Sequence, residues 1–202
     1  MSTEMQETPE HAELLDVISW IDQHTRGLEL PADDRSLIAI GCFDVAIEHQ
    51  AAIAVLHGAE LYGSMLALLR VLSESLVRGL WFSSCASEGD LAKFKNGTLR
   101  RKFEDFVSEY ENAIGTPNGV LSGFKLSTYK QMNDFTHTGI RQVSRRHMRG
   151  RVQSNYSEQD LKRALSVAGS LGLIAAGQLI DLARREDLIR LYMAKVSQYG
   201  GN

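Results

Sequence analysis

The stretch ALLRVLSESLVRGLW, residues 67–81, decides the fold class of this chain. It is apolar around most of its circumference, as a helix in the core of a domain is. Its three charged side chains, Arg70, Glu74 and Arg78, recur every four residues and therefore share one face of a helix. Because a lone charge is costly to remove from water, a network or a ligand must pair these groups. The sequence thus predicts a central buried helix over residues 59–86 with one polar stripe.

The segments around this helix also carry helical patterns. Proline occurs three times in 202 residues, and Leu, Ala, Glu and Arg dominate between the prolines, which favours long helices. The other expected helices cover residues 9–26, 34–57, 90–112, 125–148 and 157–194. We therefore predict an all-α fold, a single helical bundle of five to six helices that forms one domain over residues 1–202, with flexible tails at 1–8 and 195–202.

Two local signals mark the ends of these helices. The turn GTPNG at residues 115–119 is the clearest break in the chain. Ser157, with Asp160 three residues later, resembles a capping box in which Asp replaces the usual Glu. We expect the last helix to begin after Ser157.

The composition is that of an ordinary globular domain, with 44% hydrophobic and 23% charged residues. The two cysteines, Cys42 and Cys85, lie in apolar helical patterns, which indicates free thiols in a reducing compartment. The acidic, polar amino-terminal stretch has neither the basic start nor the apolar run of a secretory signal. We expect a cytoplasmic protein without a disulfide.

The apolar run at residues 164–180 allows two interpretations. A membrane-spanning helix needs about 20 apolar residues. The spacing of Ala168, Gly172 and Ala176 is typical of close helix packing in any solvent. We favour a buried core or dimer helix and no membrane, with a membrane segment as the alternative.

A second polar stripe follows in MNDFTHTGIRQVSRR, residues 132–146, where Asn133, His137, Arg141 and Arg145 again recur every four residues. They share a face if the helix continues through this segment. A guanidinium group can bind two phosphate oxygens at once, and a histidine can move a proton near neutral pH. This combination indicates a site for an RNA phosphodiester or a nucleotide.

The joint hypothesis is that Glu74 orients His137 while Arg70, Arg78 and Arg141 supply positive potential around it. The alternative is that the Arg/Glu/His network only fixes the register of the helices. Five arginines between residues 141 and 151, with no acid among them, leave a similar choice between a solvated surface and a nucleic-acid contact.

Metal and cofactor chemistry has little support in the sequence. A di-iron bundle needs Glu-x-x-His twice with two further carboxylates, and the nearest match is Asp134-x-x-His137. The polar residues of the 34–57 helix fit a solvated edge better than a cation site. No GxGxxG, P-loop, GxSxG or HExxH motif occurs. We expect no metal and no cofactor.

The run ending at Trp81, together with FTHTGIRQVSRR at residues 135–146, resembles an uncharacterised family of bacterial helical proteins. That family carries an ALLR..xE..VRGLW helix and a later THTG segment. The group is in turn distantly similar to HEPN domains, compact α-helical bundles that include metal-independent endoribonucleases of toxin and phage-defence systems. The HEPN signature is an Arg followed four to six residues later by a His, and Arg141 and His147 match it by count.

This resemblance implies a homodimer whose site forms where two protomers meet. It also implies His137 or His147 as general base or acid, with Arg141 stabilising the phosphorane charge. Two features depart from the HEPN pattern. Gln142 stands where Asn, Asp or His is usual, and six residues of helix rotate His147 by about 120° from Arg141. The two side chains reach one site only if the helix bends or ends between them.

Two functions follow for testing. The first is a HEPN-like protein that binds RNA or a nucleotide and cleaves RNA without metal. The second is a non-catalytic interaction module, an antitoxin-like or dimerisation subunit with a cognate protein partner. Exposure separates them, because a functional stripe must open to a cleft whereas a structural one is sealed and fully hydrogen-bonded.

Overall fold

The computed structural model describes residues 8–200, and this part of the chain is predominantly helical. The long helices are α1 (Pro9–Thr25), α2 (Asp34–Gly58), α3 (Tyr62–Ser84), α9 (Glu158–Leu182) and α10 (Glu186–Gly200). The short helices are α4 (Glu88–Lys95), α5 (Phe103–Ala113), α6 (Val120–Phe124), α7 (Lys130–Thr136) and α8 (Ile140–Val143). A two-stranded hairpin joins β1 (His147–Met148) to β2 (Arg151–Val152). The predicted all-α class is confirmed, although the described residues form more helices than the five or six expected.

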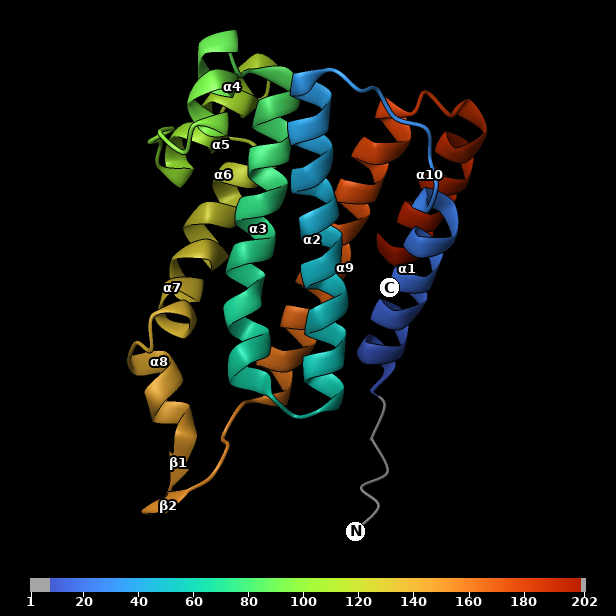
Figure 1. Cartoon of the computed structure of the whole chain (residues 1–202). Helices are drawn as coiled ribbons and strands as arrows, with labels where there is room; N and C mark the ends of the chain where they lie inside the picture. Colours follow the sequence, from blue (N-terminus) through green and yellow to red (C-terminus); the bar gives the residue numbers. More distant parts are fainter. Residues whose placement is uncertain (1–7, 201–202) are drawn as a thin grey trace.

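The long helices form an elongated bundle (Figure 1). Helices α2 and α3 are antiparallel neighbours, α9 packs against both, and α1 lies against α9 and α2. Helix α10 folds back along α9. The short helices α4 to α8 run down the other side of α3 and end at the hairpin (Figure 1). Helix α3 therefore separates the main bundle from the segment that carries the second polar stripe.

The core centres on α3, where Leu72, Leu76 and Trp81 are completely buried, as predicted for the central helix. Helices α2 and α9 meet at Gly172, where a Cβ would lie 2.1 Å from Cδ of the buried Gln50. This contact needs a residue without a side chain.

Three of the expected helices are interrupted. The 90–112 helix is two helices joined by a loop that begins at Asn96, the 125–148 helix breaks after Thr136, and the 157–194 helix ends at Leu182. The last break passes through Arg184, which takes the left-handed conformation with φ +53° although it is not a glycine. Residues 195–200, expected in a tail, belong to α10, whereas 1–7 and 201–202 lie outside the described residues.

Local capping determines where α9 begins. The Ser157 hydroxyl accepts a hydrogen bond from the Asp160 backbone N–H at 3.1 Å, which confirms the predicted start. The Asp160 carboxylate is directed to Arg145, 2.6 Å away, and so links α9 to the segment after α8.

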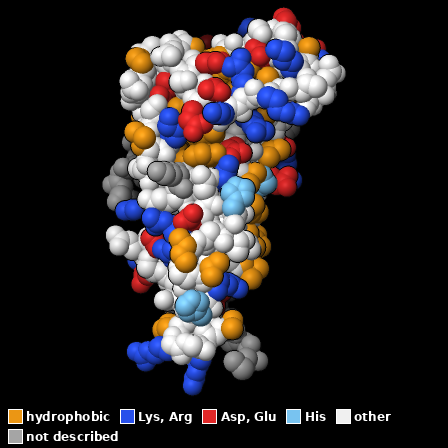
Figure 2. All heavy atoms as spheres, turned by 90° about the vertical axis from the view of Figure 1, so that its left-hand side faces the viewer, with side chains coloured by type: hydrophobic (Ala, Val, Ile, Leu, Met, Phe, Trp, Pro, Cys, Tyr) orange, Lys and Arg blue, Asp and Glu red, His pale blue; other side chains and the backbone are white. Residues whose placement is uncertain are grey.

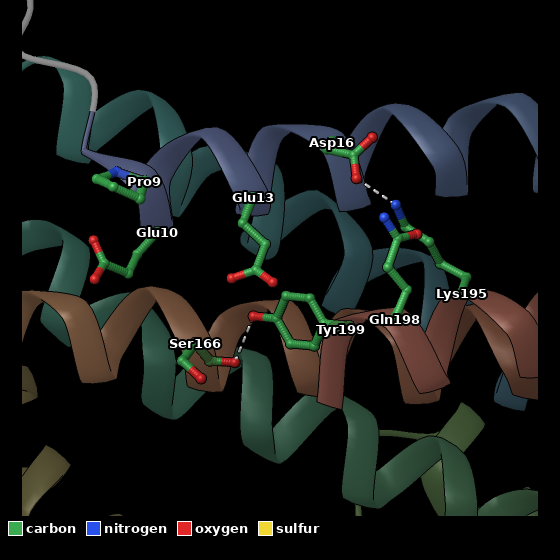
Figure 3. A pocket seen from close by; sticks show the side chains of 8 residues that line it. All are labelled: Pro9, Glu10, Glu13, Asp16, Ser166, Lys195, Gln198 and Tyr199. Atoms are coloured by element: carbon green, nitrogen blue, oxygen red, sulfur yellow. Dashed lines mark hydrogen bonds and ion pairs between the residues drawn. The ribbon is translucent and has the colours of Figure 1, made fainter. Parts of the chain in front are cut away.

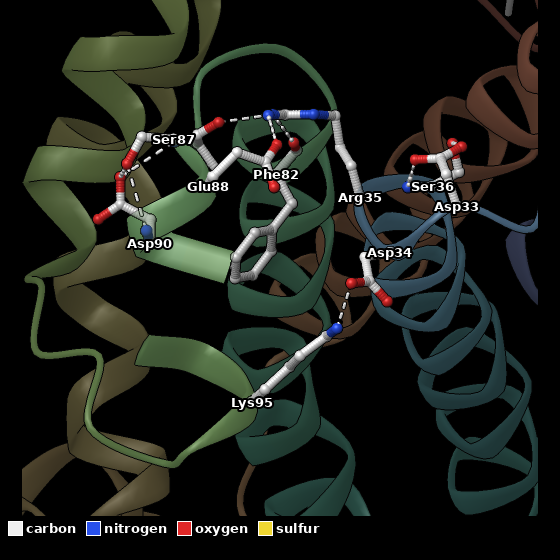
Figure 4. Close-up of polar contacts among 10 residues, drawn as sticks. Asp33, Asp34, Arg35, Ser36, Phe82, Ser87, Glu88, Asp90 and Lys95 are labelled. Carbon is white, nitrogen blue, oxygen red and sulfur yellow. Dashed lines mark hydrogen bonds and ion pairs between the residues drawn. The ribbon is translucent and has the colours of Figure 1, made fainter. Parts of the chain in front are cut away.

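Figure 4 shows how Arg35 of α2 holds the carboxyl end of α3. Its Nη1 donates to the carbonyl oxygens of Phe82 at 3.1 Å and Ala86 at 2.6 Å, and its Nη2 lies 3.2 Å from Glu88. The last carbonyl groups of a helix have no partner within it, so Arg35 satisfies them. The start of α4 is thereby fixed against α2 and α3.

Helices α2 and α9 are long and apolar enough to cross a membrane by length and composition alone. Of their most apolar windows, 33% in α2 and 56% in α9 is buried inside the structure. Small residues of α9 serve packing, because Gly169 lies against Tyr199 and Gly177 against Tyr192. Core helices of soluble proteins meet the same criterion, so this is weak evidence for a membrane span.

A buried histidine makes the stability of the bundle depend on pH. His57 is 7% exposed, and its ring centroid lies 4.6 Å from that of His11. Burial lowers the pKa of His57 and His11 lowers it further, whereas Glu10 acts in the opposite direction. The unfolded chain therefore binds this proton more readily than the folded chain. The contribution of the neutral His57 to stability is complete above its ordinary pKa of 6.5 and is lost as the pH falls below that value toward the folded pKa.

We expect the urea midpoint of the wild type to decrease as the pH is lowered from about 7.5 to 5.5. We expect His57→Phe to reduce this decrease. Chemical unfolding followed by circular dichroism at each pH checks it. An equal pH dependence in both proteins would show that His57 does not carry the effect.

Candidate functional site

Arg70 of α3 lies at the centre of the polar contacts between α3 and α7. Its Nε donates to Glu74 Oε1 at 2.8 Å, and its Nη1 donates to Asn133 Oδ1 and to His137 Nε2, the latter at 2.9 Å. Tyr129 OH donates to the same Glu74 oxygen at 2.7 Å. The structure thus brings Arg70, Glu74, Asn133 and His137 together. Glu74 does not orient His137 directly, because Arg70 lies between them.

Tyr129 is a site residue that the sequence reasoning missed. It ends a π-helical turn, Lys125–Tyr129, which changes the side-chain register just before α7. The phenol is 8% exposed, stacks on Phe103 with ring centroids 3.9 Å apart, and lies under the Arg70 guanidinium at 5.3 Å. No repeat or motif in the sequence indicates the π turn.

The hydrogen bonds and ion pairs of the network determine the protonation states of its side chains. Burial by itself would raise the pKa of Glu74, but the hydrogen bonds from Tyr129 and Arg70 outweigh burial and lower it. Burial and the neighbouring Glu74 carboxylate raise the pKa of Tyr129. Burial would lower the pKa of Arg70, yet the contacts with Glu74 and Tyr129 raise it. At neutral pH the network holds one carboxylate, one neutral phenol and one guanidinium.

His137 is exposed at the carboxyl end of α7. A guanidinium has no acceptor, so Nε2 of His137 must accept the hydrogen bond from Arg70. This contact therefore requires the tautomer that carries its proton on Nδ1. His137 lies at the rim of the network, with Nε2 engaged as a hydrogen-bond acceptor.

Beside this network lies a cavity of about 380 Å³, here called the α3–α7 cavity. It is lined by Arg70, Glu74, Arg78, Arg101, Lys102, Phe103, Glu104, Phe106, Tyr129 and Asn133. Lysine, arginine and acidic side chains gather over the upper part of the face that carries α4 to α8, with a histidine below them (Figure 2). The four candidates Arg70, Glu74, Arg78 and Asn133 all line this cavity. These four side chains are thus accessible from the cavity.

Arg78 and Lys102 are exposed cations of the cavity, and Arg78 is the one on α3. Its guanidinium lies 5.8 Å from the centroid of the Phe106 ring, and within residues 8–200 it forms no direct ion pair, although its charge helps to lower the pKa of Glu74. Arg101, in contrast, is paired with Glu109 and Asp90. The first turn of α5 also faces the cavity, and the free N–H groups of a helix start carry partial positive charge. Arg78 and this turn make the cavity suited to an anion.

The second stripe does not continue past α7, so the prediction of one helical face is wrong. Thr138 takes the left-handed conformation with φ +55°, and the Gly139 N–H donates to the Asp134 carbonyl at 2.6 Å. A Cβ at Gly139 would lie 2.8 Å from the Asp134 Cα, so a glycine is needed here. Arg141 consequently turns back to Asp134, with 3.5 Å between Nε and Oδ2, and Arg145 reaches Asp160.

The proposed HEPN pair is also separated from the network. A 3₁₀ turn, Ser144–Arg146, ends the helical segment between Arg141 and His147. His147 begins β1, where it pairs with Val152. Among the described residues no hydrogen bond joins Arg141 to His147 or connects either of them to Arg70. Neither residue lines the α3–α7 cavity, and His137 does not line it either but contacts Arg70 of its wall at 2.9 Å.

A cavity of about 510 Å³ lies elsewhere, between α1, α9 and α10. Glu10, Glu13 and Asp16 of α1 line it opposite Lys195 and Tyr199 of α10 (Figure 3). Lys195 is paired with Asp16. The three carboxyl groups make this lining unfavourable for a phosphate. Within the described residues, no group of three or more His, Cys, Asp or Glu side chains could hold a metal ion.

The fold and the site together define a helical bundle in which a partly buried Arg–Glu–Tyr network borders an open, cationic cavity. The chain belongs to a family of unknown function, DUF6988, whose model matches residues 43–200. This match includes every residue of the network and agrees with the expected uncharacterised family. No match was found among curated proteins or among solved structures.

Proposed function

We propose that this chain is a HEPN-like protein that binds the phosphate group of RNA or of a nucleotide in the α3–α7 cavity. The observation that carries the proposal is the contrast between two arginines on one face of α3. Arg70 is engaged by Glu74, Asn133 and His137, whereas Arg78 is exposed and forms no direct ion pair in the described chain. An unpaired guanidinium beside a helix amino end is a suitable partner for phosphate oxygens.

The residues of the cavity divide into positioning and binding groups. Arg70, Glu74 and Tyr129 hold α7 against α3 and keep the wall of the cavity in place. Arg78 and Lys102, with the first amides of α5, face the space that a phosphate would occupy. Glu104 at the same edge disfavours a second anionic group, so a single phosphate suits the cavity best.

On this proposal His137 is the general base for RNA cleavage. Its neutral ring takes the 2′-hydroxyl proton after Nε2 exchanges Arg70 for that hydroxyl. The 2′ oxygen then attacks phosphorus, the bond to the 5′ oxygen breaks, and the leaving oxygen takes a proton from solvent water, which gives a 2′,3′-cyclic phosphate and a 5′-hydroxyl. Arg78 takes the role of stabilising the phosphorane charge, because Arg141 is drawn to Asp134.

One observation favours the second function, a non-catalytic interaction module. Arg70, Glu74 and Tyr129 satisfy one another internally, as groups that only fix helix register do. Under this alternative Arg78 is an ordinary surface cation and the chain binds a cognate protein instead of RNA. A homodimer stays a prediction for both functions, and light scattering coupled to gel filtration measures it.

The binding experiment compares wild type, Arg78→Gln and Arg190→Gln with AMP and a labelled single-stranded RNA. Arg190 is an exposed arginine of α10 and serves as the matched control. Hydrogen bonds to charged groups are worth about 1.5–3 kcal/mol, so we expect Arg78→Gln to bind roughly 10- to 100-fold more weakly. Arg190→Gln should bind like wild type. Unchanged affinity of Arg78→Gln for both ligands would remove the basis of the proposal.

The cleavage step is tested by growth and total-RNA integrity on induced expression. We expect RNA breakdown with wild type, Arg141→Ala and His147→Ala, and its loss with His137→Ala once circular dichroism shows that each variant is folded. Intact RNA throughout, with RNA binding retained, would leave a non-catalytic RNA-binding protein. Loss with His147→Ala alone would return the catalytic role to the hairpin.

A further inference from the structure

The arginine-rich segment after α8 divides into paired and unpaired side chains. Arg141 and Arg145 contact Asp134 and Asp160. Arg146, Arg149 and Arg151 are exposed, and none has a carboxylate partner within residues 8–200. The chain as a whole carries a net charge of -3, so these three positive charges stand out against an acidic protein. They all lie in or next to the hairpin.

The hairpin presents these charges on a defined scaffold. Met148 pairs with Arg151, and the two residues between them, Arg149 and Gly150, have φ +49° and +76°. Positive φ at both central residues is the signature of a type I′ turn. The N–H of Gln153 donates to the Arg146 carbonyl at 3.1 Å and ties the hairpin base together. The projection forms the lower end of the molecule, where lysine or arginine side chains make up the tip (Figures 1 and 2).

Arg149 occupies an unfavourable position for its residue type. The first central position of a type I′ turn prefers Asn, Asp or Gly, because a longer side chain is strained in the left-handed region. Arginine at this position places a guanidinium at the tip of the hairpin turn, where it is exposed.

The hairpin and the α3–α7 cavity follow one another along the same side of α3. Helix α7 borders the cavity, and α8 leads from α7 directly to β1 (Figure 1). A mononucleotide held by Arg78 has no further phosphate to offer the hairpin. A strand with several phosphates can contact both places, and each neutralised phosphate adds affinity through release of counterions.

We infer that the hairpin is a second contact for a nucleic-acid strand, so the ligand of the cavity is single-stranded RNA of several nucleotides and not a free nucleotide. This inference rests on the proposed function of the cavity. The hairpin contributes through the phosphates, because its arginines are exposed cationic side chains on a two-stranded projection.

The test uses two variants that lose the same charge. Arg149→Asn/Arg151→Ser removes the hairpin cations, and Asn suits the type I′ turn, so the hairpin is retained. Arg184→Asn/Arg190→Ser is the matched control, because Arg184 also takes the left-handed conformation, with φ +53°. The probes are an oligouridylate of about 12 nucleotides and AMP, titrated between about 50 and 200 mM salt.

Each phosphate contact on a single strand contributes about 0.7 to the salt dependence of log K. We expect the hairpin variant to lower this slope by about 1.4 and to weaken oligouridylate binding about 20-fold at roughly 0.1 M salt, with AMP binding unchanged. The control variant should match wild type. Equal oligouridylate binding by wild type and the hairpin variant, or equal losses in both variants, would overturn the inference.

Arg78→Gln distinguishes this failure from failure of the proposed function. If Arg78→Gln weakens AMP binding while the hairpin variant binds RNA normally, the cavity stands and only the second contact is wrong. If Arg78→Gln leaves AMP and RNA binding unchanged, the cavity is not the phosphate site, and the link between cavity and hairpin is overturned with it.

Discussion

The Gly79→Ala variant is expected to lose about 2 kcal/mol of unfolding free energy. Gly79 lies on the buried face of α3, where an added Cβ would be 2.5 Å from Cε1 and 2.7 Å from Cδ1 of Phe43. The Phe43 ring is completely buried, so it cannot rotate away without moving α2 from α3. Because the three nearest atoms all belong to this buried ring, we expect a cost at the upper end of the roughly 1–3 kcal/mol that overpacking takes. The roughly 1 kcal/mol that alanine contributes to helix propensity then leaves a net loss of about 2 kcal/mol.

Gly41→Ala is the matched control for this prediction. Gly41 also lies within a long helix, α2, but nothing lies within 4 Å of the place that its Cβ would take. Alanine there is expected to stabilise the protein by about 0.5–1 kcal/mol. Urea unfolding of both variants measures the difference. If the two variants were equally stable, the close α2–α3 contact at Phe43 would be refuted.

The Glu74→Ala variant is expected to lose about 2–3 kcal/mol at neutral pH. The substitution removes the carboxylate oxygen that accepts hydrogen bonds from Arg70 Nε and Tyr129 OH. Both donors then lack this acceptor. Breaking a fully buried ion pair costs about 3–5 kcal/mol. The loss is smaller here because the Arg70 and Glu74 side chains are 20% and 25% exposed.

This loss should depend on pH in a defined direction. The pKa of Glu74 is lowered in the folded protein, because the hydrogen bonds from Tyr129 and Arg70 outweigh the effect of burial. The contribution of the carboxylate is therefore complete above the ordinary value of 4.5 and is lost as the pH falls through the folded pKa. Urea unfolding should show a constant gap between wild type and variant from about pH 7 to 5 and a narrowing gap below.

Glu104→Ala provides the control for Glu74→Ala. Glu104 lines the same cavity but is exposed, so its loss should change stability by no more than about 0.5 kcal/mol. A Glu74→Ala variant as stable as Glu104→Ala would show that the Arg70 network contributes nothing to the fold.

The features that could be predicted from the sequence are those that depend on spacing within one helix. The four-residue repeat of Arg70, Glu74 and Arg78 fixes their common face whatever surrounds α3. The same reasoning failed for Asn133, His137, Arg141 and Arg145, because it assumed an unbroken helix. That break passes through Thr138 in a left-handed conformation, which a threonine rarely adopts. The sequence signal at this break is Gly139, but an isolated glycine within a helical pattern does not by itself end a helix.

Contacts between helices could not be read from the sequence either. The pattern placed Glu74 next to His137, yet the longer Arg70 side chain reaches both of them. Tyr129 enters the network only because a π turn precedes α7. The first turn of α5 lies beside α3 because a loop separates α4 from α5. The expected continuous helix over residues 90–112 did not contain this loop. These placements depend on tertiary packing.

The binding of a phosphate beside Arg78 is tested most directly by locating it in solution. Titration with AMP, followed by NMR of arginine Nε–H groups and backbone amides, identifies the residues in contact, and Arg78→Gln assigns the key signal. Saturable shifts are predicted for Arg78 and for the Phe103 and Glu104 amides, with Arg190 unaffected. Shifts centred on Arg145 or the hairpin, with Arg78 unmoved, would contradict a phosphate site in the α3–α7 cavity.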